Sequence, residues 1–289
     1  LLQERQLYVR AYNYVTTNKG RWYDNGDRNA NIQVSSVNGS VTFGAGAGTW
    51  TVPPNVYKIR YILVGHGGKG GNGDGQNTGG GGGGGGCFTT GYMDVTPGQS
   101  IPWIVPTKIG RVNDYYVPLN SETYRGADRT SDFTKFGSAW ADTGRNGDSS
   151  TWLGRKSPQG YGGAGGSGGG TGSYEGGVGG TNGGNGGGSK GGAGQGISTT
   201  GFNGVLYCGG GAGVGGMRQI VQGGAGGGGI AGDNSDYNVP GGLGTDGLGG
   251  GGGGGRGRST NGWNSEGFGG VGGTGCIYIA WGSSMNDGS

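Results

Sequence analysis

Few side chains in this sequence could do acid–base, nucleophilic or metal chemistry. The single histidine, His66, lies in a glycine-rich stretch without a nearby nucleophile, so no histidine-based triad is indicated. Asp74, Asp233, Asp236 and Asp246 are scattered, whereas the oxygen ligands of a metal ion gather at one site. The residue pattern therefore predicts no enzyme activity, no cofactor and no metal site.

The segment that contains His66 matches a nucleotide-binding fingerprint in spacing only. Gly65, Gly67 and Gly70 follow a predicted strand, as the glycines of the dinucleotide motif do. That motif also needs a helix whose N-terminus holds the pyrophosphate. More glycine follows here instead, so we expect no nucleotide at this position.

The three cysteines, Cys87, Cys208 and Cys276, are far apart in the sequence. A zinc site needs closer pairs and more ligands. One disulfide with one free thiol is compatible with the odd number. We favour three buried structural thiols, since each cysteine lies next to glycine or near it.

Glycine dominates the chain, with 87 of 289 residues, and fills about half of the positions from 160 to 255. An interior glycine costs a helix roughly 0.5–1 kcal/mol relative to alanine, and it gives a strand no side chain to pack. A nearly bare backbone can instead adopt the left-handed threefold extended helix, which rises about 3.1 Å per residue. We therefore predict a stack of polyglycine-II-type helices across residues 160–255.

The spacing of the glycines supports this prediction in short runs. Gly177, Gly180, Gly183 and Gly186 recur every third residue, and similar triplets follow later in the block. Bulkier islands separate the runs or follow them, and we expect the chain to reverse there; they span residues 197–207, 217–222, 230–240 and 256–268. Low-complexity disorder is the competing interpretation. Collagen is excluded because the register breaks repeatedly and proline is scarce, at 8 residues.

Strand patterns flank the glycine-rich regions. Residues 57–64 alternate Tyr57, Ile59, Tyr61 and Leu63 on one face with Lys58, Arg60, Ile62 and Val64 on the other, which predicts a strand. Residues 96–99 have the proline and glycine of a type II turn, and residues 101–105 form the returning strand. Because Pro102 cannot donate to a ladder, we expect that strand at a sheet edge. Ile32, Val34, Val41 and Phe43 flank Asn38-Gly39, which predicts a hairpin.

These motifs resemble a known family. The order of motifs is similar to that of the glycine-rich domain of bacteriophage tail-fibre proteins and adhesins. It begins with Trp50-Thr51-Val52-Pro53-Pro54-Asn55-Val56 and continues with an alternating strand and a glycine run. It ends with a strand closed by Val95-Thr96-Pro97-Gly98-Gln99. Thr134-Lys135-Phe136-Gly137 resembles the short element after the first returning strand, and residues 269–282 resemble the closing strand. Glycine-rich regions of the anaplastic lymphoma kinase group of receptors share bracketing strands but carry more cysteines.

Together, the patterns and the resemblance predict a mainly β and irregular fold with essentially no α-helix. We expect an antiparallel β-sandwich-like framework that encloses a bundle of polyglycine-II-type extended helices. Residues 1–42 would form an N-terminal attachment segment with strands, although a simple N-terminal strand of the same domain is an equal alternative. Residues 43–282 would form the adhesin domain, with a glycine-poor insertion at 111–159 and a closing strand at 276–282. A tail follows at 283–289.

The glycine-poor insertion mixes aromatic and acidic side chains. They include Tyr115, Tyr116, Tyr124, Trp140, Trp152, Asp114, Asp128, Asp132, Asp142 and Asp148. Such residues could bind a carbohydrate, with rings on sugar faces and carboxylates on hydroxyls. A small satellite β-structure with its own core is the alternative.

The resemblance implies that the protein is the receptor-binding tip of a virion tail or fibre and is therefore extracellular. It would recognise a bacterial surface protein or glycan. Its N-terminal segment would attach to an upstream fibre protein or form a homotrimer. Aromatic, methionine and arginine side chains are typical of interface hot spots. The expected contact residues are those of the islands: Tyr207, Met217, Arg218, Ile220, Tyr237, Arg256, Arg258, Trp263 and Phe268. Each of them could instead cap the glycine stack.

Two other classes of function stay open at this point. A purely structural domain of a fibre, appendage or extracellular matrix would use the same scaffold without binding a receptor. A depolymerase would cleave a glycan. The net charge of +3 gives nucleic acid or a membrane surface no electrostatic footprint, and no apolar run is long enough to span a bilayer.

Overall fold

The structure, a computed structural model, describes part of the chain. The described residues are 38–73, 79–107, 133–147, 149, 162–170, 172, 177–188, 192–214, 220–232, 239–260, 263–265 and 267–285. They belong to the second of two units, Asn38–Ser289, into which the chain divides. Residues 1–37 of the predicted attachment segment, including the first half of the expected hairpin, lie outside the described residues, as does much of the 111–159 insertion. Residues 38–42, which were predicted as part of that segment, belong to the second unit.

The described residues are mainly β, with essentially no helix, as predicted. Sheet A has the antiparallel order β1 (Gly39–Phe43), β10 (Cys276–Trp281), β3 (Lys58–Val64) and β4 (Phe88–Asp94). Sheet B has the antiparallel order β2 (Gly46–Thr51), β5 (Ser100–Val105), β6 (Thr134–Phe136) and β7 (Ala139–Ala141). A separate pair joins β8 (Arg258–Thr260) to β9 (Trp263–Ser265), and the 3-10 turn η2 (Gly282–Met285) follows β10.

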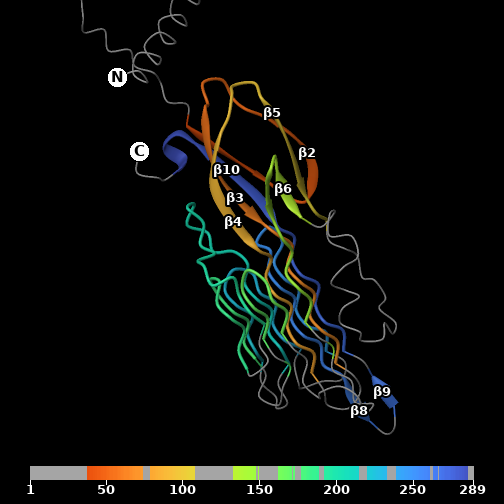
Figure 1. Cartoon of the computed structure of the whole chain (residues 1–289). Coiled ribbons are helices and arrows are strands. Elements are labelled where there is room, and N and C mark those ends of the chain that lie inside the picture. Colours follow the sequence, from red (N-terminus) through yellow and green to blue (C-terminus); the bar gives the residue numbers. More distant parts are fainter. Residues whose placement is uncertain are drawn as a thin grey trace, which may run out of the picture. The chain divides into compact units, whose positions relative to one another are not determined.

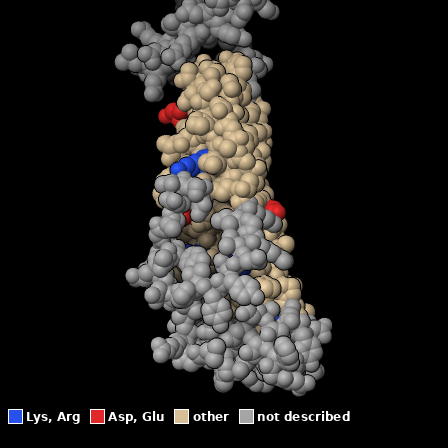
Figure 2. Space-filling view, turned by 90° about the vertical axis from the view of Figure 1, so that its right-hand side faces the viewer, with Lys and Arg blue, Asp and Glu red and all other residues tan. Residues whose placement is uncertain are grey.

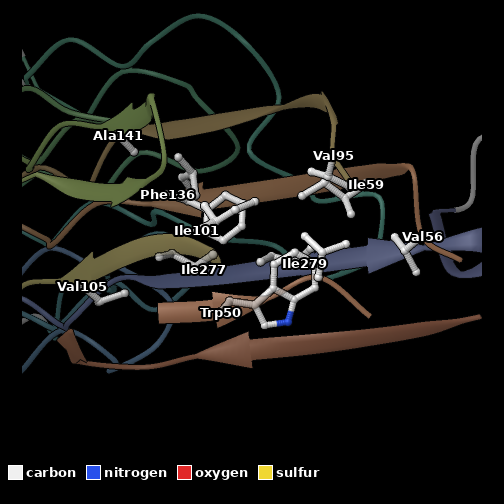
Figure 3. Packing of buried hydrophobic residues seen from close by; sticks show 12 residues of the cluster. Trp50, Val56, Ile59, Val95, Ile101, Val105, Phe136, Ala141, Ile277 and Ile279 are labelled. Atoms are coloured by element: carbon white, nitrogen blue, oxygen red, sulfur yellow. The ribbon is translucent and has the colours of Figure 1, made fainter. Parts of the chain in front are cut away.

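The two sheets share one hydrophobic core. Sheet A contributes Ile59, Leu63, Ile277 and Ile279, and sheet B contributes Trp50, Ile101, Val105 and Phe136. Figure 3 shows the labelled side chains of both sheets meeting in the space between them. Burial of this apolar surface is the main stabilising term for the two sheets.

Several local predictions are confirmed. β3 and β10 match the predicted strands at 57–64 and 276–282. The turn at 96–99 has Gly98 at φ 79° and a hydrogen bond from the Gln99 amide to the Thr96 carbonyl at 2.9 Å, which is the type II geometry. Residues 134–136 of the element noted for its resemblance form β6, whose Phe136 is fully buried; the resemblance itself stays a prediction.

Two strand predictions are wrong in placement. β5 is not an edge strand, because it pairs with both β2 and β6. Pro102 is tolerated because its carbonyl accepts from Gly137, just past the end of β6. The N–H and C=O of one residue point to the same side of a strand. The position where Pro102 lacks an N–H therefore faces Gly137, which lies beyond the last residue of β6, so no hydrogen bond to β6 itself is lost. Gly39, expected in a turn, begins β1 opposite Trp281.

Sheet A continues directly into glycine-rich segments. β3 leads into residues 65–73, residues 79–87 lead into β4, and residues 267–275 lead into β10. Figure 1 shows these segments running side by side with other glycine-rich segments away from the sheets, toward β8 and β9. We call this set the glycine block; it comprises residues 65–73, 79–87, 142–147, 162–170, 177–188, 207–214, 220–232, 241–255 and 267–275. It therefore extends well beyond the predicted range of 160–255.

The segment Gly79–Gly86 lies inside this block, with every residue buried. Its amides donate in turn to three neighbours, and the same neighbour recurs at every third residue. Gly82 and Gly85 donate to Gly170 and Ser167, Gly83 and Gly86 to Gly252 and Gly249, and Gly84 and Cys87 to Arg145 and Asp142, at 2.7–2.9 Å. In a pleated strand, by contrast, groups that point toward one neighbour recur at every second residue.

The carbonyls of the same segment follow the same three-residue step toward other neighbours. Gly80 and Gly83 accept from Val214 and Gly211, Gly81 and Gly84 from Gly71 and Gly68, and Gly82 and Gly85 from Gly163 and Gly166. Six surrounding stretches from five segments of the block thus bond to one central stretch, since residues 163–166 and 167–170 both belong to segment 162–170. This satisfies backbone groups that would otherwise be buried at a cost of about 1–3 kcal/mol each.

Glycine is required at these positions because neighbouring backbones occupy the space of a side chain. A Cβ built on Gly82 would overlap the carbonyl of Gly211, and one on Gly83 would overlap the carbonyl of Gly68. Each clash is with backbone that is itself hydrogen-bonded in the block, so it cannot move without breaking those bonds.

We predict that Gly82→Ala lowers the free energy of unfolding by about 3 kcal/mol or more, because the added methyl group forces apart bonded backbones. Gly44→Ala is the matched control, since a Cβ there meets no atom within 4 Å, and we expect a change below about 0.5 kcal/mol. Chemical denaturation of both variants is the measurement. Equal stability of the two variants would contradict the close backbone packing.

Candidate binding surface

Five exposed apolar side chains lie on five neighbouring stretches of the glycine block, two of which belong to segment 220–232. They are Val178, Ile220, Ile230, Leu243 and Phe268, each between 46% and 60% exposed. We call them the apolar row. Singly exposed apolar residues are common, but a contiguous set marks a candidate interaction site.

Hydrogen bonds show that the five stretches that carry the row are neighbours. The links are Gly179 N to Gln222 O, Ala231 N to Val221 O, Gly242 N to Ile230 O, and Gly241 N to Phe268 O, at 2.8–3.1 Å. Each bonded pair also fixes the relative position of its two segments along the long axis of the block. By this register the five side chains fall within roughly 10 Å along the block, given a rise of about 3.1–3.4 Å per extended residue.

The segments that carry the row contain no charged residue among their described positions. These are residues 177–181, 220–224, 228–232, 241–245 and 267–271. Figure 2 draws one face of the molecule, and Lys, Arg, Asp and Glu are sparse among the described residues on it. A surface of this kind suits an apolar partner, because little charge must be stripped of water when it is covered.

The structure brings several predicted contact residues to the end of the block that lies away from the sheets. Arg258 and Trp263 are on β8 and β9, at that end in Figure 1. Ile220 and Phe268 belong to the apolar row and are 59% and 57% exposed. Arg256 precedes β8 and bridges to Gly79.

Two of the predicted contact residues are buried. Arg256 is 4% exposed and Tyr207 is 5% exposed. Tyr207 lies at the sheet end, where its ring packs against Phe88 with centroids 6.1 Å apart and its hydroxyl accepts from Asn203 Nδ2 at 2.8 Å. Burial raises the pKa of Tyr207 to about 12, although the Asn203 hydrogen bond opposes this. Both positions favour the structural role that was the alternative for each island residue.

Met217, Arg218 and Tyr237 lie outside the described residues, so they stay predictions. Sequence reasoning missed Val178, Ile230 and Leu243 as surface contacts. The available signal was a single bulky apolar residue inside a glycine run, as in Gly177-Val178-Gly179 and Gly242-Leu243-Gly244. Val214 has the same sequence surroundings but is 1% exposed, so this signal alone does not separate outward from inward side chains.

The three cysteines are free thiols, and two of them are buried as predicted; all three lie where sheet A meets the glycine block. Cys208 and Cys276 are buried with Ile62, Val64 and Phe88, while Cys87 is half-buried. Burial raises the pKa of Cys276 to about 12 and that of Cys208 well above its ordinary value. Burial also raises the pKa of Cys87 to about 11, with Asp142 adding to the effect and Arg145 opposing it.

The described part of the insertion joins sheet B through β6 and β7, and so is not a separate satellite. Trp140 is 55% exposed and makes an edge contact with Phe133 at 5.1 Å. Tyr115, Tyr116, Tyr124, Trp152, Asp114, Asp128, Asp132 and Asp148 lie outside the described residues. The predicted carbohydrate site in the insertion therefore stays a prediction.

Within the described ranges, no three His, Cys, Asp or Glu side chains gather as metal ligands would. Among the same residues, no helix has the length and apolar character needed to cross a membrane. No protein-family model matches the chain, and a search of curated proteins finds no significant match.

We predict that Cys208 and Cys276 resist alkylation in the native protein at pH 8, because the reactive thiolate is scarce and the sulfurs are buried. Iodoacetamide labelling followed by mass spectrometry should modify both only after denaturation, with Cys87 intermediate. Rapid native labelling of Cys208 would contradict the packing at this junction.

We also predict that stability falls as the pH rises above about 9. An unfolded thiol ionises near its ordinary pKa of 9.0, whereas folded Cys276 holds its proton to about 12. In that interval the unfolded state binds fewer protons, so the free energy of unfolding decreases. Denaturation of wild type and Cys276→Ala between pH 8 and 10.5 is the measurement. The variant should show a shallower decline, and identical pH profiles would refute the contribution of this thiol.

Proposed function

We propose that this chain is a non-enzymatic receptor-binding protein, of the type found at the tip of a bacteriophage tail fibre. Its place would be the virion, outside the host cell, and its partner a protein on the bacterial surface. The N-terminal segment would attach it to an upstream fibre protein or to two further copies. We propose no cofactor for this activity.

We further propose that the glycine block is a bundle of polyglycine-II-type helices held in a sandwich-like framework of the two sheets. The three-residue step of the hydrogen bonds supports this, because threefold extended helices present successive groups in three directions. The overlap with neighbouring backbone that a Cβ would cause at Gly82, Gly83 and Gly85 supports it independently. Such a bundle is rigid, so side chains on it can bind without a fresh ordering cost.

The observation that carries the proposal is the apolar row on this scaffold. Its five side chains are 46–60% exposed on stretches of backbone that are hydrogen-bonded to one another. Exposed apolar groups that a fold does not need for its own core are typical of an interaction surface. The lack of charge on their segments favours a protein receptor over a glycan, whose hydroxyls need polar partners.

A purely structural role in a fibre or matrix is the second candidate. It would use the same rigid block and needs no receptor. The apolar row distinguishes the two, because a spacer has no use for exposed apolar side chains on its flank. A structural domain would therefore tolerate their replacement.

We predict that the triple variant Ile220→Ser, Leu243→Ser, Phe268→Ser binds susceptible bacteria at least about tenfold more weakly than wild type, since central apolar contacts contribute 1–2 kcal/mol or more each. Its melting temperature should stay close to that of wild type, because all three side chains are more than half exposed. Binding to whole cells and to their envelope fraction is the measurement.

Ile197→Ser is the matched control. Ile197 is 54% exposed but lies at the sheet end, two residues after Gln195, whose side-chain oxygen accepts from the amide of Phe88. We expect this variant to bind as wild type does. Full binding by the triple variant would favour the structural role, and loss of binding after glycosidase treatment of the cells would indicate a glycan receptor.

A further inference from the structure

The strand β4 forms one edge of sheet A and pairs only with β3 among the described residues. At one end of this strand pair the Gly65 amide donates to the Cys87 carbonyl at 2.9 Å. At the other end the Val95 amide donates to the Tyr57 carbonyl, also at 2.9 Å. These two bonds show that odd-numbered residues of β4 bond to β3. The even-numbered residues therefore direct their N–H and C=O groups outward, away from the sheet.

One of the outward-facing positions is already covered. Gln195 Oε1 accepts from the Phe88 amide at 2.7 Å, and Gln195 Nε2 donates to the Phe88 carbonyl at 3.4 Å. The side-chain amide thus takes the place of a neighbouring strand at this residue. The other outward positions are Thr90, Tyr92 and Asp94, which are all exposed. No described residue makes a backbone hydrogen bond to them on that side.

This edge lacks the usual protection against pairing with another strand. Natural sheet edges are blunted by proline, lysine, a bulge or a covering segment. Between residues 89 and 94, β4 has neither proline nor lysine, and it pairs with β3 residue for residue, without a bulge. An added strand would gain backbone hydrogen bonds and leave the existing sheet unchanged.

A second copy of β4 fits this edge in one antiparallel register. With Tyr92 opposite Tyr92 of the second copy, Thr90 lies opposite the second copy's Asp94, and each pair exchanges two backbone hydrogen bonds. Sliding the second strand by one step in either direction leaves fewer pairs. It brings a free position opposite the covered Phe88 or opposite the turn at 96–99, where the strand has ended.

The side chains are compatible with this register. Asp94 meets the neutral Thr90 of the second copy, so no like charges lie directly opposite each other. Tyr92 meets its own counterpart, and aromatic pairs across strands are stabilising. Arg60 is opposite Tyr92 within each copy, so the two Arg60 positions are three strand spacings apart, about 14 Å. That separation exceeds the Debye length of about 8 Å at physiological salt, so their repulsion is largely screened.

We propose that two copies of this chain associate through their β4 edges, with Tyr92 at the two-fold axis, so that sheet A continues from one copy into the other. The contact is closed, because both copies use the same edge. The interface is small, so we expect a dissociation constant of roughly 10–1000 µM. This association does not depend on the receptor-binding function.

The test is sedimentation equilibrium of the full chain between about 10 µM and 1 mM, a range that covers the expected dissociation constant. Wild type should show a monomer–dimer equilibrium. Tyr92→Pro should weaken the dimer at least about tenfold, since it removes the central outward N–H from both copies. The monomer should stay folded, because no described residue bonds to that N–H and an edge strand tolerates proline.

Thr49→Pro is the matched control on the edge of sheet B. The Val52 amide donates to the Gln99 carbonyl at 2.9 Å, and Thr49 is an odd number of residues away, so its N–H also faces outward. β2 is a poorer edge for pairing because two of its six residues are glycine. This variant should dimerise as wild type does.

A pair of charge variants tests the register itself. Thr90→Lys places a cation opposite Asp94 of the second copy and should tighten the dimer about two- to tenfold, because the pair occurs twice. Thr90→Asp places two carboxylates opposite each other and should weaken the dimer by a similar factor. Both variants lose the bond from the Thr90 hydroxyl to the Tyr61 carbonyl, so each controls for that loss in the other.

Four results would overturn the proposal. One is a wild-type protein that stays monomeric at about 1 mM, the top of the range tested. The second is a dimer that Tyr92→Pro leaves intact while the variant remains folded. The third is weakening by Thr49→Pro, which would assign the contact to β2. The last is an equal effect of Thr90→Lys and Thr90→Asp, which would exclude the register with Thr90 opposite Asp94.

Discussion

The structure depends on direct contact between neighbouring backbones at positions that have no side chain. At Gly82, Gly83 and Gly85 a single methyl group would overlap a carbonyl of an adjacent segment. Removing side chains gives up most of the hydrophobic burial that stabilises an ordinary core. Hydrogen bonding replaces it, since nearly every amide and carbonyl of the central segment has a backbone partner. The high glycine content of the chain follows from this replacement of side-chain burial by backbone hydrogen bonding.

The sheets supply what the glycine block cannot provide by itself. A bare backbone has little to fix its register, because any glycine can replace another. β3, β4 and β10 pair in sheet A and have apolar cores on both sides, and they continue into three segments of the block. Their pairing carries over, so that Gly67, Gly70 and Gly73 face Gly273, Gly270 and Gly267. The positions of the apolar row on the far segments follow from this register.

Much of the fold could be predicted from local sequence signals. The alternation in 57–64, the turn at 96–99 and the closing strand are strong local patterns, and all three are confirmed. The central place of β5 could not be predicted, because it depends on where β6 ends relative to Pro102. The apolar row could not be assembled either, because its members come from segments far apart in the sequence. Only the hydrogen bonds between segments place Val178 near Ile220 and Ile230 near Leu243.

The most direct test of the central claim is NMR detection of couplings across backbone hydrogen bonds in the deuterated protein. Our account predicts that three successive amides couple to three different segments: Gly84 to the carbonyl of Arg145, Gly85 to that of Ser167, and Gly86 to that of Gly249. A pleated sheet would instead couple Gly84 and Gly86 to one segment, and irregular coil would show no such couplings. Either of those results would contradict the three-residue step on which the scaffold rests.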